Sequence, residues 1–145
     1  DIDDEKLELA KKAGASEVIN STHEGAFEKL FELTGGGAKY VVDYVGAQAS
    51  VSFGYNLLRR GGIYVVTGLF GGSMNLQLPM LTIGARWLVG TYVGSYQEMK
   101  DLMELVKDGK IDPVPVESKP VKEINGILDD LKNGKVPGLV SISHN

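Results

Sequence analysis

Runs of β-prone residues alternate with amphipathic helical segments along this chain, and glycines mark the junctions between them. The glycines cluster at 35–37, 61–62 and 71–72. The segments 40–45, 63–68 and 87–93 are rich in valine, tyrosine and isoleucine, and the run at 40–45 is typical of a strand covered on both faces. Strands that alternate with helices form parallel sheets, so the sequence predicts α/β architecture.

Apolar spacing and capping residues predict the remaining elements. Helices are expected at 5–13, 21–34, 48–59, 80–85, 95–107 and 121–131, and further strands at 15–20 and 139–143. The helix at 48–59 is expected to turn Val51, Tyr55 and Leu58 inward. Asp43 lies inside an apolar strand and needs a polar partner if it is buried, but the sequence does not indicate which one.

The chain changes in texture after Ile111, where Pro113, Pro115 and Pro120 interrupt regular structure. Prolines of this kind are common at the boundary between structural units. The sequence therefore predicts two parts: residues 1–110, which carry the parallel sheet, and residues 111–145, which belong to another domain.

Composition excludes several classes of function. The chain has 15 Lys and Arg against 19 Asp and Glu, a net charge of −4, which argues against nucleic acid as a partner. It has no cysteine, so neither a disulfide nor a thiolate metal site can form within it. No apolar run approaches the roughly 20 residues of a membrane-spanning helix. We expect no membrane association and a cytoplasmic location.

Asp1 stands where a doubly wound nucleotide-binding fold places an acidic residue, at the end of its second strand. The helix, Gly14 and short strand that follow it are the elements that come next in that fold. The strand and the glycine-rich turn that precede the acidic residue are not found in this chain. We therefore expect a partial doubly wound (Rossmann-type) parallel sheet that lacks its first strands, and a chain cut from a longer protein.

Several stretches carry a resemblance to one family. Residues 1–15 with 18–20 resemble the zinc-dependent alcohol dehydrogenases of the medium-chain dehydrogenase/reductase superfamily. Residues 41–46, 61–71 and 89–95 look like the strands that follow in that family, and 110–135 look like its return into the catalytic (GroES-like) domain. The likeness covers essentially the whole chain, and the sequence is similar to those of archaeal, thermophile-type members of the family. It implies that this chain is the C-terminal part of such an enzyme.

The resemblance also implies a set of cofactor contacts at the carboxyl ends of parallel strands, where such folds bind ligands. Asp1 would accept hydrogen bonds from both adenosine ribose hydroxyls, which favours NAD because a carboxylate repels a 2′-phosphate. Lys6 would flank the ribose or the adenine. The remaining contacts would follow three strands: Tyr44, Val45 and Gly46 along the path between the riboses, Thr67, Gly68 and Leu69 at the nicotinamide ribose and carboxamide, and Thr91 and Val93 through their main-chain groups at the carboxamide.

Some features of the family are not matched. Members commonly carry an arginine in the final strand that contacts the pyrophosphate, and here that stretch reads Gly138-Leu139-Val140. The glycine-rich turn, the zinc ligands and the proton relay all precede the position of Asp1. His23 and His144 do not match the family's metal or relay positions. No catalytic residue and no metal ligand is therefore assigned to this chain.

Two classes of function follow. The first is part of an NAD-dependent oxidoreductase that transfers hydride between a small alcohol or aldehyde and nicotinamide, with zinc held outside this chain; a zinc-free relative similar to quinone reductases is the alternative within this class. The second is a non-catalytic folding and dimerisation module. In either case the resemblance implies a homo-oligomer through the strand Trp87–Val93, and the isolated chain is expected to bind NAD weakly because it lacks the helix N-terminus that holds the pyrophosphate.

Overall fold

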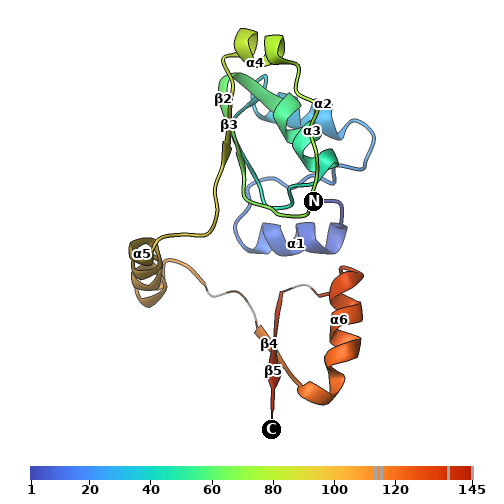
Figure 1. The fold of residues 1–145 in the computed structure, drawn as a ribbon, viewed down its shortest axis with the longest axis vertical. Helices are drawn as coiled ribbons and strands as arrows, with labels where there is room; N and C mark the ends of the chain where they lie inside the picture. Colours follow the sequence, from blue (N-terminus) through green and yellow to red (C-terminus); the bar gives the residue numbers. More distant parts are fainter. Residues whose placement is uncertain (113, 115, 137, 145) are drawn as a thin grey trace. The chain divides into compact units, whose positions relative to one another are not determined.

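The computed structural model describes residues 1–112, 114, 116–136 and 138–144, which form two compact units, 1–93 and 94–145 (Figure 1). Pro113 and Pro115 of the predicted proline-rich stretch lie outside the described residues. The predicted domain boundary at 110/111 falls within the second unit and stays a prediction. In the described residues, no helix combines the length and the apolar character needed to cross a membrane.

The first unit is built on a three-stranded parallel sheet in the order β1-β2-β3. Its elements are α1 (Asp4–Lys12), α2 (Ala26–Leu33), β1 (Ala38–Asp43), α3 (Gln48–Leu57), β2 (Leu58–Val66), α4 (Leu78–Gly84) and β3 (Trp87–Gly90). Helix α3 connects β1 to β2, as a parallel pair requires. The predicted α/β architecture with a parallel sheet is confirmed.

In its described residues, the second unit contains two α-helices and a small parallel sheet. Its elements are α5 (Tyr96–Lys107), β4 (Val116–Pro120), a 3₁₀ turn η1 (Val121–Glu123), α6 (Ile124–Lys132) and β5 (Leu139–Ser143). Ser95 caps α5 as predicted. Its hydroxyl accepts from the Glu98 N–H, and the Glu98 carboxylate accepts from the Ser95 N–H, which completes a capping box. Strand β4 was not predicted, because its sequence, Val-Glu-Ser-Lys-Pro, has little β propensity; it forms by pairing with β5.

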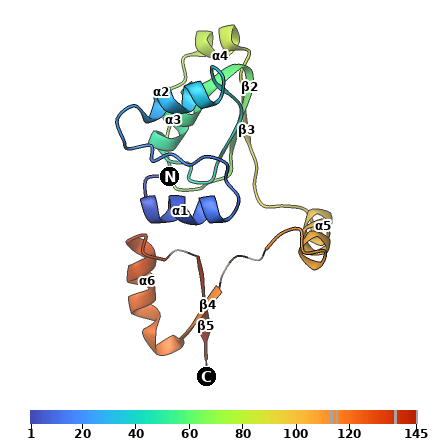
Figure 2. The ribbon, with the colours of Figure 1, turned by 180° about the vertical axis from the view of Figure 1, so that it is seen from behind.

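One face of the first sheet packs against α3 and forms the core. Tyr64 of β2 and Tyr55 of α3 are 0% and 3% exposed, and Val51 and Leu58 complete the buried cluster. Helix α2 contacts α3, and both helices lie on the same side of the sheet (Figure 1 and Figure 2). Gly54 is required here, because a Cβ on it would lie 2.7 Å from the Tyr64 ring.

The opposite face of the same sheet is exposed. Successive strand residues alternate between faces, so Tyr40 and Val42 of β1 share this face with Trp87 and Val89 of β3. Tyr40 is 59% exposed and Trp87 is 64% exposed. The expectation that the run at 40–45 is covered on both faces is therefore wrong for the structure of this chain.

The predicted strand at 15–20 is not formed as a strand, although its end is paired. The Asp1 amino group donates to the Ile19 carbonyl (3.3 Å), and the Ser21 N–H donates to the Asp1 carbonyl (3.0 Å). This alternation is one rung of a parallel ladder between Asp1 and Asn20. A single rung does not extend a strand, so the segment stays irregular.

The helix predicted at 48–59 ends earlier, at Leu57. Leu58 is buried as expected, but it belongs to β2 and pairs with Ala38. The ladder then skips to the pair Tyr40 and Ile63, so residues 59–62 bulge out of the strand around Gly61, whose φ is +72°. The glycine pair at 61–62 therefore serves this bulge rather than the end of a helix.

Candidate functional site

The parallel register brings the ends of three strands to one edge of the first unit. Tyr44, Val45 and Gly46 follow β1 directly, and Thr67, Gly68 and Leu69 follow β2. Thr91 and Val93 come just after β3. This edge is the place where open α/β sheets bind ligands.

Main-chain hydrogen bonds join the loop after β1 to the loop after β2. The Asp43 carbonyl accepts from the Thr67 and Gly68 N–H groups (2.9 and 3.0 Å) and from the Thr67 hydroxyl (2.9 Å). Two further bonds continue the same connection: Phe70 N–H to Val45 carbonyl (3.0 Å) and Gly72 N–H to Gly46 carbonyl (2.9 Å). The two loops therefore form a single connected surface.

Glycines allow these loops to come so close. A Cβ on Gly46 would overlap the carbonyl of Gly68, and a Cβ on Gly68 would overlap the main chain of Val45. Gly72 is equally confined, because its Cβ would lie 2.5 Å from the Gln48 nitrogen. The glycines therefore let the two loops pack main chain against main chain at this edge of the sheet.

Asp43, for which the sequence indicates no partner, accepts hydrogen bonds from four residues in the structure. Its Oδ1 accepts from the N–H groups of Val45 (2.8 Å) and Gly46 (3.1 Å). Its Oδ2 accepts from the hydroxyls of Ser50 (2.9 Å) and Tyr64 (2.7 Å). Asp43 is only 6% exposed, so these bonds replace the water that burial removes.

The environment of Asp43 changes two pKa values. Burial alone raises the pKa of the Asp43 carboxyl, but the hydrogen bonds from Tyr64, Gly46, Val45 and Ser50 together bring it below its usual value. Burial, the hydrogen bond to Asp43 and the charge of that carboxylate raise the pKa of Tyr64 above its ordinary range. The site therefore holds an ionised aspartate and a neutral tyrosine at neutral pH.

The tip of β3 is shaped by an unusual main-chain conformation. The Thr91 N–H donates to the Val66 carbonyl (3.0 Å), which carries the ladder one residue past β3. Val93 has a φ of +48° and its side chain is 79% exposed. A β-branched residue in this region is strained by about 1–3 kcal/mol, and such strain is frequent at ligand-binding positions.

Asp1 and Lys6 lie on a separate piece of the first unit. Asp1 is exposed, and its Oδ1 accepts from the N–H groups of Ile2 (2.7 Å) and Asp3 (3.1 Å). Asp3 in turn caps α1 and accepts from the Lys6 N–H (3.3 Å). The N-terminus lies at the end of the unit where β1 and β2 finish (Figure 1). Within the described residues, hydrogen bonds join Asp1 and Lys6 to their own surroundings and not to the β1 and β2 loops.

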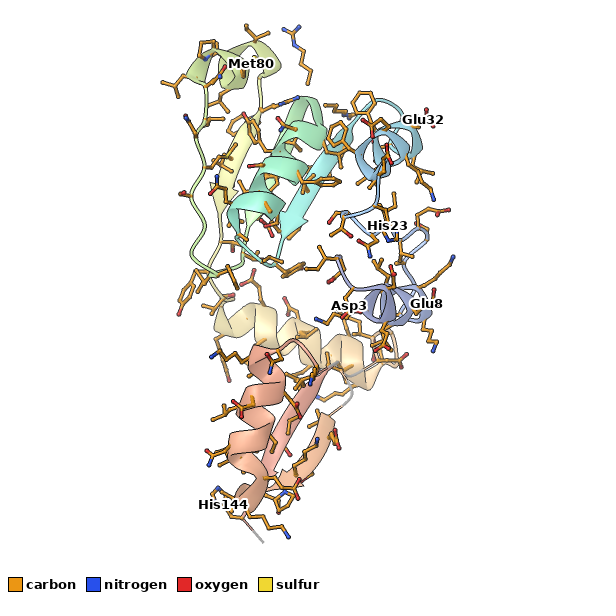
Figure 3. All side chains as sticks on the ribbon, turned by 90° about the vertical axis from the view of Figure 1, so that its right-hand side faces the viewer. Asp3, Glu8, His23, Glu32, Met80 and His144 are labelled. Atoms are coloured by element: carbon orange, nitrogen blue, oxygen red, sulfur yellow. The ribbon has the colours of Figure 1, made fainter. Side chains whose placement is uncertain are left out.

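Two hollows accompany these residues. One, of about 360 Å³, is lined by Gly46 and Gly68 and by the apolar side chains of Val51 and Met74. The other, of about 420 Å³, is lined by residues of α1 and of the turns before α2, including Glu8 and His23, which Figure 3 labels. Both volumes fall at the low end of the range for ligand pockets.

No zinc site can be built from the part of the chain that the structure describes. In these residues, no group of three or more His, Cys, Asp or Glu side chains could hold a metal ion. His23 is exposed at the turn ahead of α2, where Asn20 accepts from the N–H and hydroxyl of Thr22 and delays the start of the helix to Ala26. The predicted helix start at 21–24 is thus replaced by a turn.

Sequence reasoning missed two residues of this edge, Ser50 and Tyr64. The signal that could have found them was Asp43 itself, because a carboxylate in a buried strand needs donors from whatever packs on it. Ser50 lies on α3 seven residues later, and Tyr64 lies on the neighbouring strand. Both face the core side of the sheet.

The sequence of the chain is similar to those of known dehydrogenases. A family model described as "Zinc-binding dehydrogenase" matches residues 1–108. An NAD-dependent alcohol dehydrogenase of Sulfurisphaera tokodaii is 32% identical over 139 residues, which are 95% of this chain and 40% of the relative. An alcohol dehydrogenase of Geobacillus stearothermophilus is 31% identical over 140 residues, 97% of this chain and 41% of the relative.

The fold shows the same likeness. The crystal structure of an alcohol dehydrogenase from the archaeon Aeropyrum pernix superposes with a TM-score of 0.88 at 33% identity, over 97% of this chain and 40% of that protein. The chain thus spans about 40% of the length of the relatives it matches.

Proposed function

Because the chain belongs to the zinc-binding dehydrogenase family, we propose that it forms part of an NAD-dependent oxidoreductase acting on a small alcohol or aldehyde. Relatives that bear the name alcohol dehydrogenase support this activity. The observation that carries the proposal for this chain is the close packing of the glycine-rich loops after β1 and β2 at the carboxyl edge of a parallel sheet, beside a hollow that Gly46 and Gly68 line.

The nicotinamide of a bound NAD supplies the hydride acceptor or donor. The proposed role of this chain is to bind and orient that cofactor. The carboxylate of Asp1 would accept from the ribose hydroxyls and disfavour a 2′-phosphate, with Lys6 beside it. The main-chain groups at Tyr44–Gly46, at Thr67–Leu69, and at Thr91 and Val93 would follow the cofactor toward its reactive ring. The zinc ligands are proposed to lie outside this chain, and so are the acid–base groups.

A titration of the chain with NAD tests this assignment. At millimolar NAD we expect amide chemical shifts to change at the three strand tips, because the proposed cofactor contacts lie there. Calorimetry is expected to detect no binding in the micromolar range, because the helix N-terminus that would hold the pyrophosphate is not found in this chain. A dissociation constant of 1 mM corresponds to a binding free energy of only about 4 kcal/mol.

Two controls sharpen the result. NADP should shift the same amides less, and the variant Asp1→Asn should narrow that difference because the repelling charge is removed. Shifts spread evenly over both units, or none at the strand tips, would contradict the proposed cofactor site. Micromolar affinity would contradict the expectation that this chain holds only part of the site.

We also propose that the chain associates through β3. All four residues of β3 are exposed, Trp87 and Leu88 among them, and the strand lies at the edge of the sheet with its outer main-chain groups available for pairing. Light scattering is expected to give a dimer mass. Replacing Val89, whose side chain stands on the exposed face, by lysine should shift the mass toward the monomer, whereas Val42→Lys on β1 should leave it unchanged. A monomeric wild-type chain would exclude this interface.

A cytoplasmic location is proposed for the protein. It rests on the absence of cysteine from the sequence, because secreted proteins of oxidising compartments commonly carry disulfides and this chain forms none.

A further inference from the structure

The geometry assigns to Asp43 a positioning role in the candidate cofactor site. Its carboxylate holds the loop after β1 and its carbonyl group holds the loop after β2, so that Asp43 positions both sets of predicted contacts without itself touching the ligand. This inference rests on the proposed function, because it concerns the same strand tips. Both the side chain and the main-chain carbonyl group of Asp43 take part in this role.

The side chain of Asp43 holds the loop after its own strand. Oδ1 accepts from the main-chain N–H groups of Val45 and Gly46, two of the residues expected at the cofactor. The other oxygen, Oδ2, is held by Tyr64, which is 0% exposed, and by Ser50. The turn after β1 is therefore joined through Asp43 to the most deeply buried part of the core.

The carbonyl of the same residue holds the loop after the neighbouring strand. It accepts three bonds, from the N–H groups of Thr67 and Gly68 and from the Thr67 hydroxyl. Any rotation of Asp43 would thus displace both loops together. Since a Cβ does not fit between Gly46 and Gly68, the spacing of the loops has little freedom once Asp43 is in place.

Residue-by-residue amide hydrogen exchange on the full chain separates this role from a general contribution to stability. In Asp43→Asn the acceptor charge is lost while the side-chain volume is kept. We expect exchange at Val45, Gly46 and Gly68 to accelerate by about tenfold or more beyond the change at Val65 in β2. Equal acceleration in the loops and in the strand would overturn the positioning role.

A matched variant provides the reference for a purely structural effect. Leu58→Val removes a buried methylene at the opposite end of β2, where the side chain is 1% exposed. It is expected to accelerate the loops and the strand together. If Asp43→Asn does not fold, Ser50→Ala takes its place, because Ser50 donates to Asp43 and accepts from the Ala47 N–H (3.1 Å). Acceleration at Val45 and Gly46, whose N–H groups donate to Asp43 and not to Ser50, supports the role; a uniform change, or none at these two residues, overturns it.

The link to the cofactor is tested in a second arm with NAD as the probe. The NAD-dependent shifts at Gly46 and Gly68 should be lost in Asp43→Asn and retained in Leu58→Val. Retained shifts in Asp43→Asn would overturn the role in cofactor binding. Because the exchange experiment uses no cofactor, a wild-type chain that shows no NAD shifts would contradict the proposed function itself, whatever the exchange result.

Discussion

Gly46→Ala is expected to lower the free energy of unfolding of the chain by roughly 2–5 kcal/mol. Two costs combine. The φ of Gly46 is +70°, where a side chain costs about 1–2 kcal/mol, and the new Cβ would overlap the Gly68 carbonyl, so that one loop must move. Overpacking of this kind adds about 1–3 kcal/mol. Urea unfolding followed by circular dichroism measures the loss.

Gly61→Ala is the matched control for this substitution. Gly61 has nearly the same φ, +72°, but its Cβ would meet nothing within 4 Å. The control should therefore show only the conformational cost of about 1–2 kcal/mol. Equal losses in the two variants would mean that the close approach of Gly46 to Gly68 does not exist in solution.

Asp43→Ala is expected to be at least as damaging, with a loss of about 3–5 kcal/mol. The substitution removes the acceptor of four hydrogen bonds and leaves the buried Tyr64 hydroxyl and the Gly46 N–H without it. Losing a bond to a charged group costs about 1.5–3 kcal/mol, and each buried donor left unpaired adds to this. Asp129→Ala, on the exposed surface of α6, should change stability by less than about 0.5 kcal/mol.

The same variant has a pH signature. The pKa of Asp43 is lower in the folded chain than in the unfolded chain, so the ionised carboxylate stabilises the fold above the unfolded value of about 4. That stabilisation is lost as the pH falls through the folded pKa. Wild type and Asp43→Ala should therefore differ most at neutral pH and less in acid. A difference that stays constant down to low pH would contradict the ionised role.

The sequence was informative where local rules agree with the sheet. Residues 40–43 of β1 and 63–66 of β2 lie in β-prone runs, and Ser95 begins α5 with its capping box, so each could be predicted from its own residues. The position of Asp43 inside an apolar strand predicts a polar partner for a buried carboxylate, and the structure contains such partners. Its partners were not predictable, because Tyr64 reaches it through strand register and Ser50 through the packing of α3, neither of which a linear pattern encodes.

The wrong predictions have the same origin. Residues 15–20 are predicted as a strand, but a strand needs neighbours along its length, and among the described residues the ladder-type pairing of this segment is limited to the rung with Asp1. Leu58 has the spacing of an inward helical residue and is buried, yet its pairing with Ala38 places it in β2. Strand β4 shows the reverse case, in which a partner strand makes up for weak propensity. In each case long-range pairing outweighs local preference.

The rung between Asp1 and Asn20 joins the two ends of the segment 1–21 to each other. It closes residues 1–21 into a lobe around α1, of whose helical residues only Leu7 is buried, while the strand-tip loops are anchored to Tyr64 in the core. The part of the proposed site at Asp1, toward the adenosine, and the part at the strand tips, toward the nicotinamide, are thus held in place by different contacts. We expect opening of the α1 lobe to weaken the proposed contact of Asp1 with the ribose at little cost to the rest of the fold, so that affinity at the adenosine end would vary independently of global stability.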